Sequence, residues 1–263
     1  MHGTVGYAAP VAGADRRRAV HRGDQSGHAM TPTLVFLPGS LCDSRVWQAV
    51  YLSLRADYPC IDWNYPRDDS IAAMATRVLE AVSGPLLPVG LSMGGIVALE
   101  MWRQAPHRLD GLALFGTNPG PDTPERRQAR AGQMELAGRD GIERLARERL
   151  APAYLAPGAA GREPFTSTVA AMAVSAGVEV FADQSDALAG RADSWPILPG
   201  IDVPVLVAYG SADRVCPPDG HLRMAGLLQR GSGVALERAG HLAPLEQAAE
   251  SAQALRNWLA SLH

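Results

Sequence analysis

The chain has 263 residues, of which 47% are hydrophobic, and its formal net charge at pH 7 is −3. This length and composition suit one folded domain with a sizeable core, and they give no indication of disorder or of nucleic-acid binding. All 24 basic residues are Arg, and the absence of lysine excludes Schiff-base catalysis, a Walker-type phosphate loop and a Ser-x-x-Lys nucleophile.

Residues 1–30 differ from the rest of the chain because they show no sustained periodicity and are rich in Gly, Ala, Arg and His. The basic run 16–18 follows the only mildly apolar piece, residues 5–14. A secretory signal has its charges first and its apolar stretch after them. We therefore expect a disordered extension, or an upstream segment of a protein that properly begins at Met30, and no export signal.

The three cysteines, Cys42, Cys60 and Cys216, are an odd number without close spacing. This pattern predicts reduced thiols and neither a disulfide framework nor a zinc site, and packing is the favoured role for Cys42 and Cys216. No run approaches the ~18 apolar residues of a membrane span. We expect a cytoplasmic protein without a membrane segment, a metal or a cofactor.

From residue 33 onward, short apolar runs alternate with helical patterns. Strands are expected at 33–37, 60–63, 85–89 and 112–115, and helices at 44–56, 70–82 and 96–104. Asp69 or Ser70 is expected to cap the second of these helices. Alternation at this spacing predicts right-handed crossovers and a mainly parallel sheet of α/β class.

The segment from Gly90 to Gly94 has the form Gly-x-Ser-x-Gly and lies between a predicted strand and a predicted helix. A serine on such a tight turn presents its hydroxyl at the top of the sheet, and the glycines avoid collisions within the turn. The helix that follows directs its first N–H groups toward any anion formed at Ser92. Ser92 is therefore the predicted nucleophile. Pro88 conflicts with the strand because it has no N–H, but the turn follows at once and the strand assignment is kept.

A serine nucleophile needs a histidine base and an acid that orients it, and both are found downstream. The apolar run 203–209 predicts a strand buried on both faces, and Asp213 follows its end. The short strand 233–237 leads to His241, which precedes the last predicted helix, 245–262. Taken singly, Asp213 could equally be a turn or helix-cap residue without a catalytic role, and His241 an ordinary loop residue. Their common position after strands, in the order Ser, acid, His, predicts a triad.

Between residues 119 and 199 the alternation stops, and helical patterns run over 124–150, 165–176 and 178–188. The mixed charges of this insertion predict a solvated outer face. Gln184 and the segment 191–195 are expected to anchor its last part. For Arg191 an ion pair with an acidic neighbour is favoured over a clamp for a substrate carboxylate.

Several apolar residues of the insertion are expected to line the gap between it and the rest of the protein. For any single one, packing within the insertion is the favoured alternative to contact with substrate. They are Met134, Leu136, Tyr154, Phe165, Met172 and Phe181.

From about residue 33 to the C-terminus the chain resembles the α/β-hydrolase family. The residues that carry this likeness are 37–40 before Trp47, 90–95, Gly210-x-x-Asp213 and Gly240-His241. The resemblance implies a parallel sheet flanked by helices, with a core formed by residues 31–118 and 200–263. Residues 119–199 would form a helical cap inserted between two strands.

The resemblance also implies a role for each site residue. Ser92 would be the nucleophile, His241 the general base and then the general acid, and Asp213 the residue that holds the imidazole. An oxyanion hole would be formed by the backbone N–H of Met93 and by one in the first loop, where Ser40 is expected and Leu41 is the second choice. The chain has Pro38-Gly39 in that loop, where many members of the family have His-Gly.

The expected activity is hydrolysis of a carboxylic ester of a small or medium apolar substrate through an acyl-enzyme intermediate. A thioesterase or a lactonase would use the same triad. A cofactor-free carbon–carbon hydrolase, lyase or perhydrolase is a further enzymatic alternative, and a non-catalytic ligand receptor on the same fold is the least favoured. The pattern predicts no particular substrate and no oligomeric state.

Overall fold

The computed structural model describes residues 31–158 and 163–262, so the expectation for residues 1–30 lies outside the described residues. Within them, one parallel sheet has the strand order β2-β1-β3-β4-β5-β6. Its strands are β1 (Thr33–Leu37), β2 (Cys60–Asp62), β3 (Leu86–Leu91), β4 (Leu112–Phe115), β5 (Val205–Gly210) and β6 (Gly231–Leu236). The predicted α/β class and the parallel sheet are confirmed.

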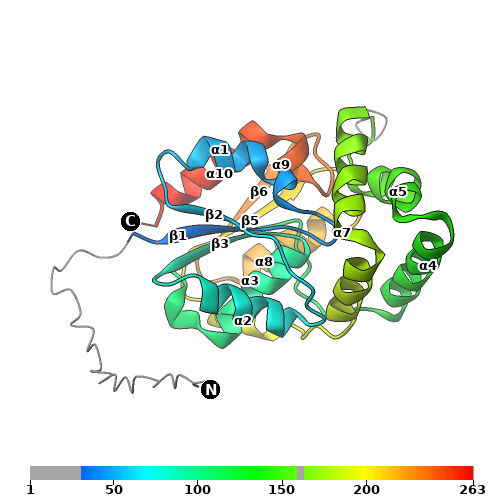
Figure 1. Cartoon of the computed structure of the whole chain (residues 1–263). Coiled ribbons are helices and arrows are strands. Elements are labelled where there is room, and N and C mark those ends of the chain that lie inside the picture. Colours follow the sequence, from blue (N-terminus) through cyan, green and yellow to red (C-terminus); the bar gives the residue numbers. More distant parts are fainter. Residues whose placement is uncertain (1–30, 159–162, 263) are drawn as a thin grey trace, which may run out of the picture.

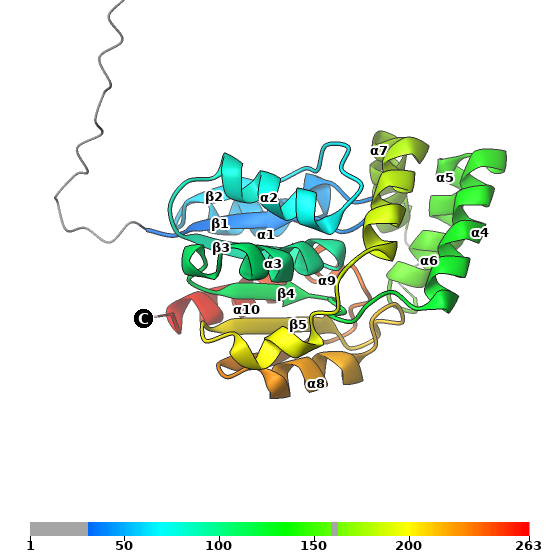
Figure 2. The same ribbon diagram turned by 90° about the horizontal axis from the view of Figure 1, so that it is seen from below.

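Helices cover both faces of this sheet (Figures 1 and 2). One face carries α1 (Gln48–Leu54), α9 (Ala243–Glu246) and α10 (Ala248–Ala260), and the other carries α2 (Ile71–Ala81), α3 (Met93–Gln104) and α8 (Pro218–Leu227). Short 3-10 turns are η1 (Ser44–Val46), η2 (Pro106–Arg108) and η4 (Trp195–Gly200).

The apolar strands explain this layering because successive side chains of a strand point to opposite faces. In β1, Leu34 and Phe36 belong to the hydrophobic core under α1 and α10, whereas Val35 and Leu37 belong to the core under α2 and α3. A sheet that is buried on both faces needs continuous apolar strands, as the sequence indicated.

Most predicted elements are found with shifted ends. Ser70 caps α2, with its Oγ accepting from the N–H of Ala73 at 3.2 Å. The expected helix 44–56 is a 3-10 turn followed by α1, and the expected last helix 245–262 is divided into α9 and α10. Helix α3 begins at Met93, immediately after Ser92. Turns at Trp47 and Gln247 divide the two expected helices, because the spacing of apolar residues continues through these positions although the helical backbone does not.

Pro88 fits into β3 because its nitrogen faces a side where a hydrogen bond is not required. Leu86, two residues earlier, accepts from Asp110 N on the β4 side, and alternation places the Pro88 nitrogen on that side too. On that side Leu86 bridges Leu109, and the register of β3 with β4 resumes at Val89↔Ala113 after one extra residue on the β4 side, while Pro88 is paired in register with Val35 of β1. The proline therefore costs little pairing at the start of the ladder.

The insertion between β4 and β5 is helical and lies beyond the carboxyl ends of the strands (Figure 1). Its described elements are α4 (Pro124–Asp140), α5 (Ile142–Leu145), the π-helical turn η3 (Ala146–Leu150), α6 (Ala151–Tyr154) and α7 (Glu163–Ala189). This arrangement confirms the predicted helical cap between two strands.

Helix α7 is broken at Gly177, where φ is 80° and ψ is 170°. The break agrees with the two predicted helices 165–176 and 178–188. Among the helices of residues 31–158 and 163–262, α7 is the one that is long and apolar enough to cross a membrane, whereas no membrane span was expected from the sequence. The break, and the burial of Ala173 and Phe181 in the hydrophobic core, identify it as part of the cap.

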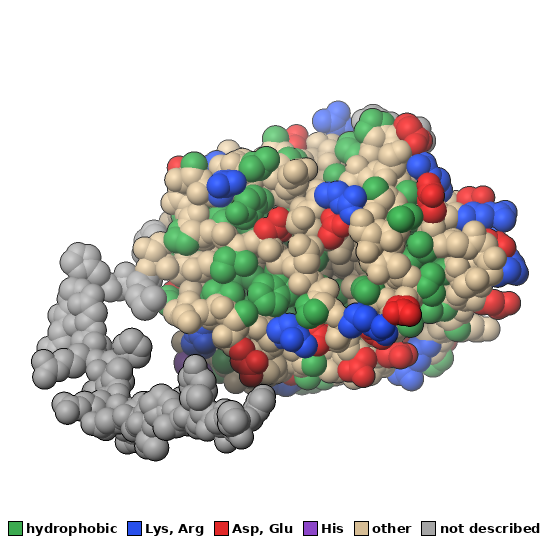
Figure 3. Space-filling view, viewed as in Figure 1, with side chains coloured by type: hydrophobic (Ala, Val, Ile, Leu, Met, Phe, Trp, Pro, Cys, Tyr) green, Lys and Arg blue, Asp and Glu red, His purple; other side chains and the backbone are tan. Residues whose placement is uncertain are grey.

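The molecular surface carries charges of both signs. Figure 3 shows basic and acidic side chains interspersed over one face, including the part formed by the cap. On the cap, Arg147 pairs with Glu143 and Glu163, each at 3.0 Å. Exposed pairs of this kind contribute little to stability, and they agree with the solvated outer face predicted for the insertion.

Candidate active site

Ser92 lies on the turn that joins β3 to α3, in a conformation that non-glycine residues rarely adopt. Its φ is 53° and its ψ is −111°. The backbone holds this turn from both sides, because Ser92 N donates to Phe115 O of β4 at 2.8 Å and Ser92 O accepts from Ile96 N at 3.1 Å. Backbone strain maintained by surrounding structure is a common property of functional residues.

The glycines beside Ser92 allow a very close approach of backbone segments. A Cβ at Gly90 would collide with the backbone of Gly94 and Gly95, and a Cβ at Gly94 would collide with the carbonyl group of Leu37. Both positions therefore require glycine for steric reasons. This crowding pins the first turn of α3 against β1, which brings the loop after β1 next to Ser92.

Asp213 and His241 form a buried hydrogen-bonded pair. His241 Nδ1 lies 2.8 Å from Asp213 Oδ2, and each residue is 3% exposed. Asp213 follows β5, and its second oxygen accepts from the N–H groups of Val215 and Cys216 at 2.8 and 2.9 Å. These bonds fix the carboxylate, and they leave Nε2 as the imidazole nitrogen that can act on another group.

The surroundings of Asp213 favour its ionised form. Burial by itself raises the pKa of this carboxyl, but the charge and hydrogen bond of His241, together with the N–H groups of Cys216 and Val215, outweigh burial and lower the pKa below its ordinary value. Asp213 is therefore a carboxylate throughout the neutral range.

The loop that carries His241 is tied to the cap. His241 N donates to Tyr154 O at 2.6 Å. Glu246 bridges the two parts, because one of its oxygens accepts from Gly240 N and the other from Ala156 N, both at 2.8 Å. Burial raises the pKa of Glu246, and these two hydrogen bonds oppose the rise. Glu246 was not predicted from the sequence, in which a glutamate five residues after His241 was the only available signal.

Two backbone N–H groups near Ser92 are the candidate oxyanion donors. Met93 is the first residue of α3, so its N–H has no acceptor within the helix. In the loop after β1, the N–H of Leu41 donates to Gln184 Oε1 at 2.8 Å. The N–H of Leu41, the second choice for the oxyanion donor, is therefore already engaged. Among the hydrogen bonds of the described residues, none is donated by the N–H of Ser40, the first choice.

Gln184 holds the loop after β1 from the cap. Its side chain, on α7, is 4% exposed, and its Oε1 accepts from both Leu41 N and Ser40 Oγ, the latter at 3.0 Å. Leu41 has a positive φ of 55°, an unusual conformation for leucine, and this contact helps to maintain it. Gln184 was predicted to anchor the cap, and its contact with the candidate oxyanion loop is new.

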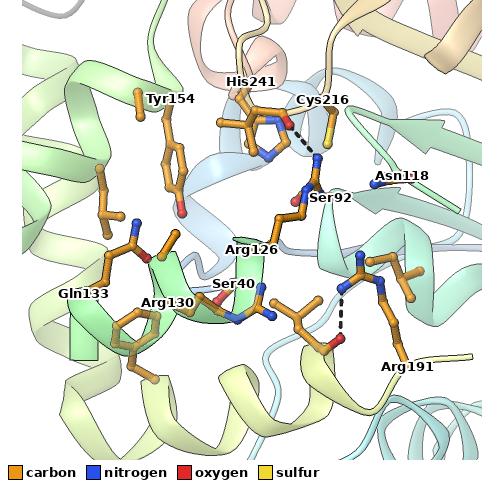
Figure 4. Close-up of a pocket in the computed structure, with 17 residues that line it drawn as sticks. Ser40, Ser92, Asn118, Arg126, Arg130, Gln133, Tyr154, Arg191, Cys216 and His241 are labelled. Carbon is orange, nitrogen blue, oxygen red and sulfur yellow. Dashed lines mark hydrogen bonds between the residues drawn. The ribbon is translucent and has the colours of Figure 1, made fainter. Parts of the chain in front are cut away.

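A cavity of about 280 Å³ brings Ser40, Ser92 and His241 together beneath the cap (Figure 4). Of the cap residues expected at this gap, Tyr154 and Phe181 line the cavity. Of the other four, Met172 is buried in the hydrophobic core that also contains Leu34 and Phe36, and Met134, Leu136 and Phe165 pack against that core. Ile96, Leu150 and Leu188 supply further apolar wall. The volume is at the lower end for ligand pockets and suits a small molecule.

Arg191 forms the structural ion pair that was favoured for it. Its Nη1 lies 2.8 Å from Asp122 Oδ1, and the two side chains are 2% and 0% exposed. The same guanidinium donates to the carbonyl groups of Gly120 and Leu188. Arg191 therefore fastens the end of the cap to the segment that follows β4.

The cysteines next to the site are protonated thiols. Cys216 lines the cavity, and burial followed by the negative charge of Asp213 raises its pKa to about 12. Burial and the charge of Asp43 raise the pKa of Cys42 to about 12 as well. Because the thiolate is the reactive form, packing is the role that these values support. The three cysteines are free, as predicted.

The fold and this site belong to a known class of protein. Residues 34–254 match the Alpha/beta hydrolase family, which is most of the chain, and the protein is therefore a member of that family. The resemblance inferred from the nucleophile turn and the downstream Asp and His is confirmed.

Proteins of similar sequence include an esterase and a synthase. Over 207 residues, 74% of this chain and 76% of the relative, the chain is 32% identical to a pimeloyl-[acyl-carrier protein] methyl ester esterase of Neisseria meningitidis serogroup B. Over 211 residues, 72% of this chain and 79% of the relative, it is 31% identical to a 2-succinyl-6-hydroxy-2,4-cyclohexadiene-1-carboxylate synthase of Klebsiella pneumoniae.

Among solved structures, a thermophilic esterase from Thermogutta terrifontis, with malate bound, superimposes with a TM-score of 0.80. It is 29% identical in sequence, and the match covers 88% of this chain and 90% of that one.

Proposed function

We propose that the protein is a serine hydrolase that cleaves a carboxylic ester of a small or medium apolar substrate through an acyl-enzyme. The observation that carries this proposal is the buried Asp213–His241 pair at 2.8 Å, whose His241 lines the cavity to which Ser92 also contributes. The esterase names of two of the similar proteins support the same reaction type. The apolar walls of the cavity support an apolar substrate portion.

The proposed reaction has two halves. Ser92 Oγ attacks the ester carbonyl carbon while His241 Nε2 takes the hydroxyl proton, and the N–H groups of Met93 and Ser40 stabilise the oxyanion. The tetrahedral species then breaks its bond to the leaving alcohol, which receives the proton from His241. Water attacks the acyl-enzyme by the same steps and releases the acid and free Ser92. The net change is ester plus water to acid plus alcohol.

The first test is hydrolysis of a chain-length series of p-nitrophenyl esters by the wild type and by Ser92→Ala. We expect Ser92→Ala to lower kcat by roughly 10⁴- to 10⁶-fold, because the covalent step is lost. Ser53→Ala, which changes an exposed serine of α1, is the matched control and should stay close to the wild type. Equal inertness of the wild type and Ser92→Ala on every ester would contradict the proposal.

A second candidate is a reaction at a carbon–carbon bond that uses the same residues as acid and base without a cofactor. The relative that is named a synthase favours it, because that chain matches over a similar length at similar identity. Steady-state assays on diketone substrates distinguish the two reactions. Turnover of a diketone by a protein that is inert on all esters would favour this second candidate.

A further inference from the structure

The cavity wall contains more positive than negative charge. Arg126, Arg130 and Arg191 line it, and the lining includes no Asp or Glu from the part of the chain that the structure describes. Two buried carboxylates lie near the wall without lining the cavity: Asp213, which pairs with His241, and Asp122, which pairs with both Arg130 and Arg191. A single carboxylate therefore serves two of the three lining guanidinium groups.

Arg126 is the lining arginine without a carboxylate partner in the described segments. Its Nη2 donates to Val215 O at 3.1 Å, in the loop that carries Asp213. Since a guanidinium offers several N–H donors, this bond positions the group and leaves others able to bind a ligand. Figure 4 shows Arg126 reaching from α4 toward the side of the cavity where Ser92 and His241 lie.

An unpaired cation in a partly buried position is unfavourable, because it loses hydration without gaining a counter-charge. A carboxylate on the substrate would supply that counter-charge. The planar guanidinium matches the two oxygens of a carboxylate with two parallel hydrogen bonds, a geometry that a neutral substrate cannot provide.

The place of Arg126 in the cavity wall would allow it to bind a carboxylate of the substrate while the ester carbonyl group lies at Ser92. Arg126 lines the cavity of Ser92 and also a neighbouring cavity of about 240 Å³, together with Asn118 and Cys216, which line both. A substrate with its carbonyl group at Ser92 and its carboxylate at Arg126 would place an apolar segment between them, against walls that include Ile96 and Leu188.

We propose that the substrate of this site is a small ester that carries a carboxylate group away from the scissile bond, and that Arg126 binds this carboxylate. The proposal rests on the proposed ester hydrolysis and changes one part of its substrate class: the segment between the ester and the carboxylate is apolar, and the far end of the substrate is charged. The carboxylate belongs either to the acyl part, as in a half-ester of a dicarboxylic acid, or to the alcohol part, as in an acylated hydroxy acid. The chemistry at Arg126 is the same in both.

The test compares each anionic ester with its carboxamide isostere. The acyl arm uses monomethyl glutarate and methyl glutaramate, and the alcohol arm uses 3-acetoxypropanoate and 3-acetoxypropanamide. We expect the wild type to prefer the anionic ester in one arm by roughly 10- to 100-fold in kcat/KM, because hydrogen bonds to a charged group are strong. The arm that shows the preference identifies which part carries the carboxylate.

Arg126→Gln should reduce this ratio to near 1, and Arg126→Lys should leave an intermediate ratio, since Lys keeps the charge without the paired donors. Because the ratio is measured within one variant, a general loss of folded enzyme cancels. Arg139→Gln is the matched control, since Arg139 lies on the same helix α4 with its side chain 65% exposed, and it should keep the wild-type ratio.

A wild-type ratio near 1 in both arms, with Ser92-dependent cleavage of the esters, would overturn the carboxylate proposal and leave the proposed function standing. Calorimetric titration of glutarate into Ser92→Ala, with and without Arg126→Gln, tests recognition separately from turnover. Binding that weakens roughly tenfold or more with Arg126→Gln supports the site even when no ester is cleaved. Absent binding, or binding that Arg126→Gln leaves unchanged, would overturn it.

Discussion

Individual side chains that join the cap to the rest of the protein complete the surroundings of the candidate triad. Gln184 reaches the loop of Ser40 from α7, and Glu246 connects the His241 loop with Ala156 of the cap segment. Each side chain accepts hydrogen bonds from two donors: Gln184 from two neighbouring residues of one loop, and Glu246 from residues of two different loops. The geometry of the site therefore depends on residues that do not touch the reacting atoms.

Gln184→Leu is expected to lower kcat roughly tenfold with little change in KM, because it leaves the N–H of Leu41 without its acceptor and releases the loop that carries Ser40. Steady-state kinetics on a p-nitrophenyl ester measures both constants. A matched variant, Gln184→Glu, keeps an oxygen acceptor at the same reach and should recover much of the lost kcat. A rise in KM at constant kcat would instead indicate that Gln184 contacts substrate only.

At the level of elements, two glycines of the cap differ in how much their helices need them. Helix α7 requires its glycine at the break, whereas α4 does not require the glycine in its interior. Gly177 has φ 80° and ψ 170°, a conformation that is essentially restricted to glycine. Gly132 lies within α4, and a Cβ there would meet nothing within 4 Å. The same substitution should therefore have opposite effects at the two positions.

Gly177→Ala is expected to reduce the free energy of unfolding by about 1–3 kcal/mol, because alanine is strained at that break. Gly132→Ala should raise it by about 0.5–1 kcal/mol, because alanine restricts the unfolded chain and favours the helix. Urea unfolding followed by tryptophan fluorescence measures both. Stabilisation by Gly177→Ala would mean that α7 is continuous through this position.

The whole molecule joins two hydrophobic cores, one on each face of the sheet, with a cap packed on the carboxyl ends of the strands. The buried Asp213–His241 pair lies where sheet and cap meet, so its charge state affects the stability of the whole fold as well as catalysis.

The free energy of unfolding should depend on pH through Asp213. The folded-state pKa of Asp213 lies below that of an unfolded Asp, about 3.9, so its stabilising contribution is fully present above that value and is lost as pH falls through the folded-state pKa. Between about pH 5 and 2 the wild type should therefore lose stability more steeply than Asp213→Asn. Urea unfolding at a series of pH values measures this difference. Parallel curves would show that Asp213 is not stabilised as a carboxylate.

The candidate site was predictable from sequence where local signals determine position. A glycine-flanked serine between strand and helix, and an Asp and a His each just after a strand, are assigned by short-range patterns, because the carboxyl ends of parallel strands meet at one edge of a sheet. The helical cap was equally visible as an interruption of the alternation, and the break at Gly177 was visible as a glycine between two helical patterns.

Other features depend on contacts between distant parts of the chain. Gln184 and Ser40 are 144 positions apart, and the pairing of Asp122 with Arg191 crosses 69 positions. Within the described segments, only the tertiary structure shows that Asp122 pairs with Arg130 and Arg191 and that Arg126 has no carboxylate partner. The sequence by itself determined the family, the parallel sheet and the residues proposed for catalysis, since local patterning encodes them. Tertiary packing decided which donors are occupied, which charges are compensated and the shape of the cavity, because these properties arise only when separate elements meet.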